Sequence, residues 1–358
     1  MVSVAVAVIA AIVVAAGVLL VGGVGRSAAH GRVRGLPNAL ASERLFFAEA
    51  DRTGLYQADG VRLRTFPSLA GTGYVAPLVS GDGQVFYIHD GRAYRTSGTG
   101  AATPVNLGSV QVHAAASNLI PTPNGGIGIE LAPIEGPATI RLLNADGGHA
   151  TTPLTRPLPP GAHVAAEVPS GLLIETPGSF SDPIVAISSL RLSLFGPQRD
   201  VFLGLASAVI GVHGDAVAWT SCPAPRSPNC ALHVMDTSSG EARIIPSPAR
   251  YNGFAQIGGG FSPNGRMLAA FVPSRLPGGA VELHLVVEDL ATRAVSVVEP
   301  AIPSDVLSGG VATWSADGHW LYFGGVTGRL HAREIGPSGP RGHSWALPLP
   351  TSVAVVGD

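Results

Sequence analysis

Two cysteines are the residues whose spacing most directly suggests chemistry. Cys222 and Cys230 are the only cysteines of the chain, and they stand at the two ends of the proline-rich stretch Cys-Pro-Ala-Pro-Arg-Ser-Pro-Asn-Cys. The flanking segments 216–219 and 231–235 are rich in apolar residues, as strands are, so the two thiols should face each other across a hairpin neck. We expect a disulfide, with two unrelated buried thiols as the alternative. A persistent disulfide is typical of an oxidising compartment outside the cytoplasm.

Motifs that would name a reaction do not occur in the sequence. It contains no Gly-x-Ser-x-Gly nucleophile elbow, no His-Glu-x-x-His zinc helix, no Gly-x-x-x-x-Gly-Lys phosphate loop and no EF-hand carboxylate run. The 11 histidines are scattered without the spacing of metal ligands. We therefore expect no catalytic residues, no metal site and no cofactor, while a site whose residues converge only in three dimensions remains open.

Long connections between the expected strands offer a binding surface, because loops on a rigid scaffold often carry recognition. They run from Pro177 to Ser188, from Cys222 to Cys230 and from Pro273 to Gly279. Arg and Tyr are enriched at binding hot spots. The candidate residues of this loop face are Phe180, Asp182, Arg226, Arg250, Tyr251, Phe254 and Arg275. Ordinary variation in surface loops is the competing interpretation.

A recurring turn motif indicates the scaffold that carries these loops. Segment 261–271 begins Phe-Ser-Pro-Asn-Gly, segment 314–323 begins Trp-Ser-Ala-Asp-Gly, and each continues as an apolar strand. Asn-Gly and Asp-Gly readily adopt the positive φ angles of tight hairpin turns. Weaker copies of the motif lie at positions 82, 124, 170 and 214. Together with the sharp copies at 264 and 317, they are spaced by 42, 46, 44, 50 and 53 residues. This is the period of a four-stranded propeller blade, lengthened by loops.

The repeated residues themselves are expected to be structural. The Asp82, Asn264 and Asp317 side chains should stabilise their own turns. Aromatic residues recur at equivalent repeat positions, which favours packing between blades over ligand stacking. These aromatic residues are Phe86, Trp219, Phe261, Trp314 and Trp320.

The Ser-Pro-Asp-Gly-type turn followed by an apolar strand resembles the WD-like repeat of TolB-type bacterial periplasmic proteins. The resemblance covers residues 43–358 with two sharp copies, and it implies a β-propeller without implying a particular function. The first unit offers three strands, and residues 352–356 form an orphan strand that would complete it. We therefore expect an all-β propeller of seven four-stranded blades closed by the C-terminal strand, with six and eight blades as alternatives.

An apolar segment precedes the repeats. Residues 2–25 carry no charged side chain, and as a helix they would span about 36 Å, enough to cross a hydrocarbon core of about 30 Å. We expect residues 1–25 to form a transmembrane anchor or uncleaved signal. A cleaved signal peptide is the alternative, because Ser27-Ala28-Ala29 resembles a cleavage site. Residues 26–42 would then form a tether, and the propeller domain would span 43–358.

The orientation of this anchor rests on two opposing signals. Arg26, Arg32 and Arg34 follow the apolar segment, and the positive-inside rule would place them in the cytoplasm. The expected disulfide favours the opposite side, and long domains are translocated largely regardless of flanking charge. We expect a single-pass protein of the cell membrane with an extracytoplasmic propeller domain.

The charge content narrows the classes of partner. Charged residues make up 13% of the chain and the net charge is −2, which disfavours a nucleic-acid partner. We expect a non-enzymatic binding or scaffold module whose partner is another envelope or membrane protein, a peptide or a cell-wall component. The alternatives are a propeller-type enzyme, such as a lactonase, glycosidase or quinoprotein with its site in the central channel, and an extracytoplasmic sensor domain.

Overall fold

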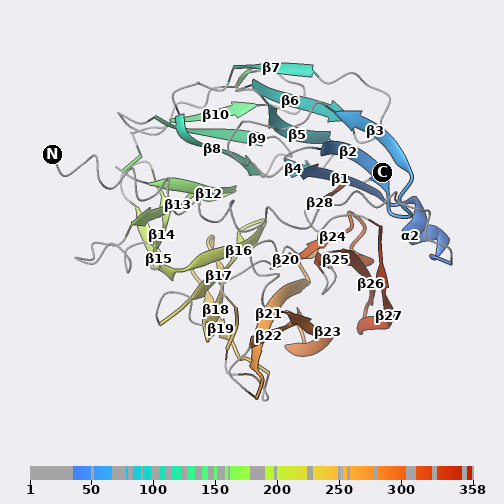
Figure 1. Cartoon of the computed structure of the whole chain (residues 1–358). Coiled ribbons are helices and arrows are strands. Elements are labelled where there is room, and N and C mark those ends of the chain that lie inside the picture. The colour runs from blue at the N-terminus through green and yellow to red at the C-terminus, as the bar shows by residue number, and fades with distance from the viewer. Residues whose placement is uncertain are drawn as a thin grey trace. The chain divides into compact units, whose positions relative to one another are not determined.

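Strands dominate the part of the chain that the computed structural model describes (Figure 1). The chain divides into two units, Met1–Gly31 and Arg32–Asp358, and every described residue belongs to the second unit. The described residues are 35–49, 52–66, 78–79, 84–89, 92–97, 105–109, 114–121, 127–133, 139–143, 149–150, 158–159, 162–177, 190–196, 200–223, 229–248, 251, 253–255, 259–277, 281–303, 312–324, 329–348 and 353–356.

The described strands form seven four-stranded antiparallel sheets. The first four, in spatial order, are β28 (Val353–Val356), β1 (Arg44–Glu49), β2 (Arg52–Gln57) and β3 (Arg62–Phe66); β4 (Leu78–Val79), β5 (Gln84–His89), β6 (Arg92–Ser97) and β7 (Val105–Ser109); β8 (Ala114–Pro121), β9 (Ile127–Pro133), β10 (Thr139–Leu143) and β11 (His149–Ala150); and β12 (His163–Val168), β13 (Gly171–Pro177), β14 (Leu190–Phe195) and β15 (Val201–Ala206). The other three are β16 (Ala208–His213), β17 (Ala216–Ser221), β18 (Ala231–Asp236) and β19 (Ala242–Ile245); β20 (Gly259–Phe261), β21 (Met267–Arg275), β22 (Val281–Asp289) and β23 (Ala294–Pro303); and β24 (Ala312–Trp314), β25 (Trp320–Gly324), β26 (Leu330–Gly336) and β27 (Gly339–Ala346).

The first strands of these sheets contact one another in a closed circuit. The order is β28, β4, β8, β12, β16, β20, β24 and back to β28. β28 pairs antiparallel with β1, with Arg44 opposite Val356 and Phe47 opposite Val353. The pairing confirms the expected position of the C-terminal strand, and it joins the two ends of the described chain in one sheet. As a result, β1 has no open edge.

The two sharp repeats form turns that are held by their own side chains. The Ser262 hydroxyl donates a hydrogen bond to Asn264 Oδ1 at 2.8 Å. The equivalent Ser315 hydroxyl donates to Asp317 Oδ1 at 2.6 Å. Each serine oxygen also accepts a backbone N–H from the following strand, at 2.9 Å and 2.8 Å respectively. These contacts confirm that Asn264 and Asp317 stabilise their turns, and Asp82 lies outside the described residues.

The repeated aromatic residues pack within and between sheets, as expected. Phe86, Trp219, Trp314 and Trp320 are 1 to 7% exposed, and Phe261 is partly buried. Trp314 also donates its Nε1–H to the carbonyl oxygen of Gly260 at 3.0 Å, which ties β24 to the neighbouring strand β20. Packing between sheets therefore accounts for most of these side chains.

The folded unit begins before the boundary that we expected at Glu43. A short helix, α2 (Asn38–Ser42), precedes β1. Leu40 is fully buried in a cluster with Leu45, Tyr322 and Leu347, and Leu36 packs against the same cluster. Part of the expected tether 26–42 is therefore packed core. No helix among the described residues is long and apolar enough to cross a membrane, and the apolar segment 2–25 lies outside them.

Candidate binding site beside the disulfide

Cys222 and Cys230 form a disulfide, which confirms the expected pairing; their Cα atoms lie 4.1 Å apart. Cys222 directly follows β17 and Cys230 directly precedes β18, so the bond closes the hairpin between these strands. Cys230 also exchanges two backbone hydrogen bonds with Phe254, at 2.9 and 2.8 Å. The disulfide therefore anchors the hairpin and the Phe254 segment to each other.

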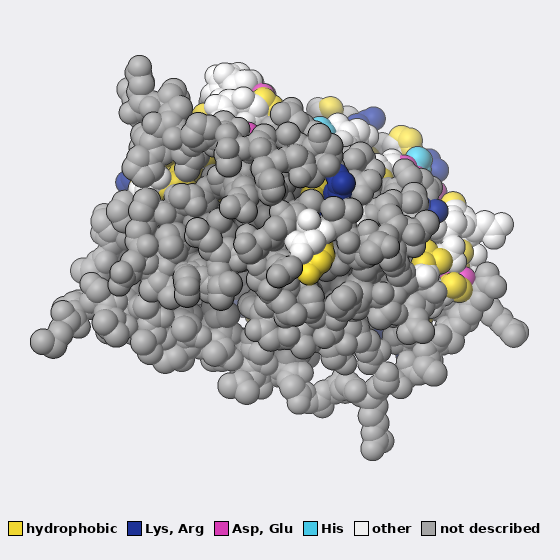
Figure 2. Space-filling model, turned by 90° about the horizontal axis from the view of Figure 1, so that it is seen from above, with side chains coloured by type: hydrophobic (Ala, Val, Ile, Leu, Met, Phe, Trp, Pro, Cys, Tyr) yellow, Lys and Arg dark blue, Asp and Glu magenta, His cyan; other side chains and the backbone are white. Residues whose placement is uncertain are grey.

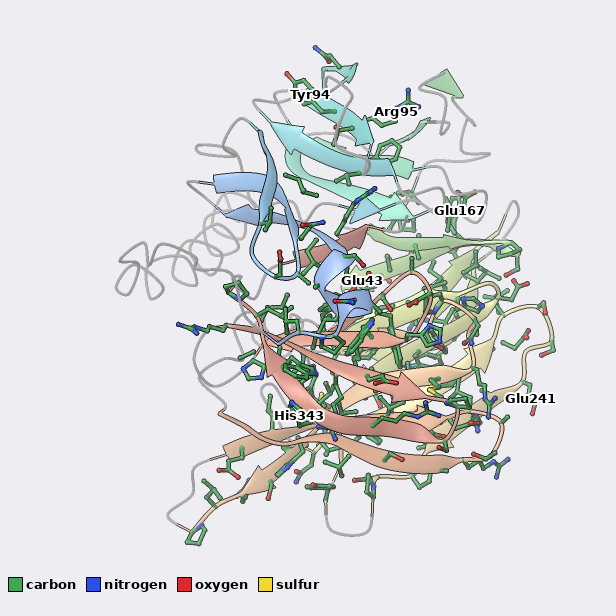
Figure 3. The ribbon with its side chains drawn as sticks, turned by 90° about the vertical axis from the view of Figure 1, so that its right-hand side faces the viewer. Glu43, Tyr94, Arg95, Glu167, Glu241 and His343 are labelled. Atoms are coloured by element: carbon green, nitrogen blue, oxygen red, sulfur yellow. A yellow bond between two sulfur atoms is a disulfide. The ribbon has the colours of Figure 1, made fainter. Side chains whose placement is uncertain are left out.

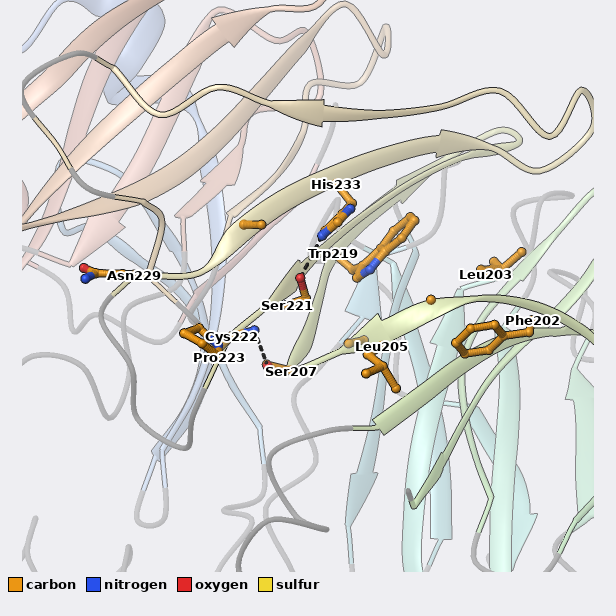
Figure 4. Close-up of a pocket in the computed structure, with 13 residues that line it drawn as sticks. Phe202, Leu203, Leu205, Ser207, Trp219, Ser221, Cys222, Pro223, Asn229 and His233 are labelled. Atoms are coloured by element: carbon orange, nitrogen blue, oxygen red, sulfur yellow. Dashed lines mark hydrogen bonds between the residues drawn. The ribbon is translucent and has the colours of Figure 1, made fainter. Parts of the chain in front are cut away.

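A pocket of about 590 Å³ lies beside this disulfide, between β15 on one side and β17 and β18 on the other (Figure 4). We call it the β15 pocket. Its lining residues are Phe202, Leu203, Gly204, Leu205, Ala206, Ser207, Trp219, Ser221, Cys222, Pro223, Asn229, Ala231 and His233. The volume is within the range of about 300 to 1,000 Å³ that is typical of ligand pockets, and apolar side chains with a few polar groups are their usual lining.

The register of the hairpin brings three side chains of the pocket together. Trp219 and His233 are directly opposite each other on β17 and β18, and their rings stack with centroids 5.0 Å apart and planes 9° apart. Ser221 lies two residues beyond Trp219, so it shares the same face of the strand. Its Oγ is 2.7 Å from His233 Nε2 (Figure 4). Burial lowers the pKa of His233, which favours the neutral imidazole near pH 7.

Trp219 forms part of the pocket wall and has a buried hydrogen-bond donor. The residue is 2% exposed, and its buried Nε1–H has no acceptor among the described residues. Gly204 of β15 leaves room for the indole, because a Cβ there would lie 3.2 Å from Trp219 Cζ2. Buried donors are nearly always paired in folded proteins. The Nε1 atom is itself covered, with Gly204 packed against the indole, so the ring and not its N–H faces the pocket.

The other wall of the pocket carries exposed apolar side chains. Phe202 and Leu205 of β15 line this wall and are 49 and 46% exposed, and Val201, which adjoins the pocket in sequence only, is 48% exposed. β15 is the last strand of its sheet, and no described strand pairs with its outer side. The exposed Arg191 places its guanidinium carbon 4.5 Å above the Phe202 ring. The pocket is therefore bordered by an apolar strand edge with one cation at its rim.

The Ser221 and His233 pair has the spacing of a nucleophile and its general base. Acyl transfer also needs a group that orients the second ring nitrogen and donors that stabilise an oxyanion. Within the described part of the chain, no carboxylate bonds to the other nitrogen of His233. The neighbouring backbone N–H of Cys222 is already donated to Ser207 Oγ at 3.0 Å. The described residues therefore supply a serine and a histidine in contact, without the other two parts of an acyl-transfer site.

The loop-face residues that the sequence indicated are only partly visible. Tyr251 and Phe254 are 7 and 2% exposed and belong to the core cluster around β18 and β21, so they offer little surface to a partner. Arg275 is exposed at the end of β21, opposite Val281. Phe180, Asp182, Arg226 and Arg250 lie outside the described residues. The structure therefore does not bring these seven residues together in one described patch.

Sequence reasoning missed the β15 pocket, although a signal for it existed. Counting the same number of residues back from Cys222 and forward from Cys230 pairs Trp219 with His233, which is the register that the hairpin has. A disulfide closing a hairpin fixes this register. The position of β15 across from these side chains carried no comparable signal, because it depends on packing between two sheets.

Metal-ligating side chains do not cluster in the described part of the chain, where no group of three or more His, Cys, Asp or Glu residues could hold an ion. Burial raises the pKa of Glu167 on β12, but Figure 3 shows Glu43, Glu167 and Glu241 far apart. On the face seen in Figure 2, described Arg side chains lie near the centre and along the right-hand edge. The three labelled carboxylates therefore form no ion site together.

Comparison with known proteins shows the fold alone. No family model and no curated protein matches the chain. Among solved structures, it is similar to oligogalacturonate lyase from Vibrio parahaemolyticus, with 11% identity over 83% of this chain and 88% of that chain and a TM-score of 0.57. It is also similar to the β-propeller domain of the Trilobed protease from Pyrococcus furiosus, with 9% identity over 85% of this chain and 92% of that chain and a TM-score of 0.55.

A third similar structure is the Pyrococcus horikoshii acylaminoacyl peptidase, with 11% identity over 85% of this chain and a TM-score of 0.56. The match covers 50% of that peptidase. These likenesses and the four-stranded antiparallel sheets identify the fold as a β-propeller. At such low identity they do not transfer a reaction, because one fold hosts many functions.

Proposed function

We propose that this protein is a non-enzymatic binding module, a β-propeller that recognises another envelope protein or a peptide through the β15 pocket. The observation that carries the proposal is a pocket bordered by β15, whose outer edge pairs with no described strand and whose Phe202 and Leu205 side chains are about half exposed. Exposed apolar surface of this kind commonly marks an interaction site. A cell-wall component is the other partner class that the sequence suggested.

We further propose that the seven sheets are the seven blades of one propeller, closed by β28. The closed circuit of contacts between first strands supports this count. The first and the last strand of the described chain share one sheet, so the scaffold would hold β15 and β17 rigidly enough to keep the pocket open. A rigid scaffold lowers the entropy cost of binding.

The proposed location is the cell membrane, with the propeller outside the cytoplasm and the apolar segment 2–25 as a single-pass anchor. The disulfide between Cys222 and Cys230 supports an oxidising compartment. Protease accessibility in spheroplasts would test the orientation. Digestion of the propeller in intact spheroplasts is expected, whereas protection until lysis would place the domain in the cytoplasm.

A comparative pull-down from crosslinked membranes of the native organism tests the binding role. The full chain is compared with Phe202→Asp/Leu205→Asp, which alters the pocket edge, and with Arg226→Glu/Arg250→Glu/Arg275→Glu, which alters the loop face. We expect a partner that the first variant loses and the second retains. Loss only in the second variant would move the site to the loop face. Equal recovery by both variants would remove both site assignments.

The 2.7 Å contact between Ser221 Oγ and His233 Nε2 favours one second candidate, an enzyme that uses Ser221 as a nucleophile. A fluorophosphonate probe would label such a serine covalently. Labelling of the full chain that disappears in Ser221→Ala would support this enzyme. The binding proposal expects no labelling above the level of that variant.

A further inference from the structure

We propose that the ligand of the β15 pocket is an extended peptide segment that adds as a strand to the free edge of β15, places an apolar side chain in the pocket and presents an acidic residue to Arg191. This inference rests on the proposed binding function and names the chemistry of the partner. Strand addition combines backbone hydrogen bonds with pockets for side chains.

The free edge supplies the first part of the recognition. β14 pairs with one side of β15 through five residue pairs, from Leu190 opposite Ala206 to Leu194 opposite Val201. The outer side pairs with no strand among the described residues. An unpaired strand edge offers a row of N–H and C=O groups to an incoming strand. An extended peptide has free backbone N–H and C=O groups to pair with this row, whereas those of a helix are already bonded within the helix.

A bulge explains why the edge exposes two large apolar side chains. Gly204 pairs with Leu192 and Phe202 pairs with Ser193, so Leu203 is an extra residue on β15. The extra residue interrupts the alternation of faces, and both Phe202 and Leu205 remain about half exposed. Bulges often redirect side chains beside functional sites. An incoming apolar side chain would bury this surface.

The polar groups of the pocket indicate the charge of the ligand. Trp219 lines the pocket with its indole ring, while its Nε1–H is buried. Ser221 and His233 already bond to each other, and the lining residues include no carboxylate and no Lys or Arg. An uncharged part of the peptide therefore fits inside the pocket.

Arg191 supplies the only cation that the described residues place at this edge. Its guanidinium lies over Phe202, and the described residues give it no ion-pair partner. A carboxylate of the ligand can pair with it without entering the pocket. Apolar residues together with one acidic residue therefore describe the peptide better than a basic sequence does.

The test begins with a random twelve-residue peptide library on phage, selected against the full chain in detergent micelles. Enriched peptides are synthesised, and binding is measured by fluorescence anisotropy. Phe202→Asp/Leu205→Asp should weaken binding by at least about 30-fold, the scale expected for hot-spot residues. The matched control is Ile244→Asp, at an apolar side chain that is 64% exposed on β19, another edge strand. It should bind as the unaltered chain does.

Charge reversal tests the acidic residue. Arg191→Glu should lower the affinity for the selected peptides several-fold, and Arg275→Glu on β21 should leave that affinity unchanged. If both variants bind equally well, Arg191 has no part in recognition and the acidic requirement is wrong. If only Arg275→Glu weakens binding, the peptide binds at the loop face, and the β15 assignment is wrong.

The indole signals provide a readout at the proposed contact. The chain has 4 Trp residues, so its proton–nitrogen NMR spectrum should contain four Nε1–H signals, and Trp219→Phe identifies one of them by its loss. Adding a selected peptide should shift the Trp219 signal, because the peptide packs beside the indole ring that lines the pocket. An unmoved signal with a bound peptide would overturn the contact.

Other outcomes separate the peptide inference from the binding function. If no peptide is enriched but the membrane pull-down still recovers a partner that Phe202→Asp/Leu205→Asp loses, the function stands and the linear peptide is wrong. If that double variant changes the sedimentation coefficient of the full chain, a second copy of this chain occupies the edge instead. If the pull-down also recovers nothing that depends on β15, the proposed function of the pocket fails.

Discussion

The imidazole of His233 is held between two contacts, a 2.7 Å hydrogen bond with Ser221 Oγ and a flat stack on Trp219. The stack on Trp219 sets the plane of the imidazole ring, and the hydrogen bond sets the position of its Nε2 atom. Because the ring is partly buried, charging it costs more in the folded protein than in water. Protonation of His233 is therefore less favourable in the folded protein than in the unfolded chain.

The first prediction concerns the pH dependence of stability. The folded-state pKa of His233 lies below its unfolded value of about 6.5, so the unfolded state binds the proton more readily. His233 therefore favours folding fully above pH 6.5, and this contribution falls as the pH drops below that value. Thermal melts should show a larger loss of Tm between pH 7.5 and 5 in the unaltered chain than in His233→Gln. The His343→Gln variant, at an exposed histidine on β27, controls for the loss of an imidazole. Parallel curves for the unaltered chain and His233→Gln would contradict the prediction.

The second prediction concerns the disulfide. Cys222 and Cys230 are 8 residues apart, and closing so short a loop stabilises a fold by about 2 to 3 kcal/mol in the chain-entropy description. The Cys222→Ser/Cys230→Ser variant should lose about this much free energy of unfolding in denaturant titrations. Reductant should bring the unaltered chain to the same value and leave the variant unchanged. A reductant effect on the variant would show that the loss has another source.

The third prediction concerns Gly253, in the segment that pairs with Cys230. Its φ is +143°, and an added Cβ would lie 2.9 Å from both Cα and the carbonyl carbon of Asn229. Gly253→Ala should therefore lower the free energy of unfolding by about 2 to 3 kcal/mol. Gly240→Ala is the matched control, because Gly240 has φ +75° but no atom within 4 Å of an added Cβ, and it should cost about 1 kcal/mol. Equal losses would mean that the Asn229 backbone moves aside without cost.

The fourth prediction concerns closure by the C-terminal strand. Deleting residues 351–358 removes β28 and exposes the edge of β1 from Arg44 to Phe47. Because β28 also contacts β4 and β24, the loss should lower the Tm of the whole propeller in a single transition. Replacing Gly357-Asp358 with Ser-Ser leaves β28 intact and serves as the control. An unchanged Tm after the deletion would show that β28 does not close the sheet circuit.

Much of the fold was predictable because it depends on local sequence signals. The turn motifs at Asn264 and Asp317, the disulfide and the C-terminal strand all follow from spacing and turn chemistry, and the structure confirms each one. The start of the folded unit was expected at Glu43, but the packed residues begin earlier in the chain. Leu36 and Leu40 lie in a stretch without periodicity, and their burial depends on contacts with β25 and β26.

The candidate site was harder to predict, because it depends on contacts between sheets. Trp219 has an equivalent position in other repeats and was assigned to packing, which its 2% exposure confirms. Its unpaired Nε1–H becomes visible only when β15 and Gly204 are placed against it. Conversely, Tyr251 and Phe254 are typical binding residues by type, yet the pairing of Phe254 with Cys230 draws their segment into the core.

Site-specific photo-crosslinking in membranes of the native organism tests the central claim most directly. A photoreactive amino acid is placed at Phe202, at Leu205 or, as the control, at Ile244, and crosslinked peptides are identified by mass spectrometry. The binding account predicts that positions 202 and 205 capture the same extended segment of an envelope protein and that position 244 does not. Capture of that segment from position 244 alone, or no crosslink at 202 and 205 under conditions where another position captures a partner, would contradict it.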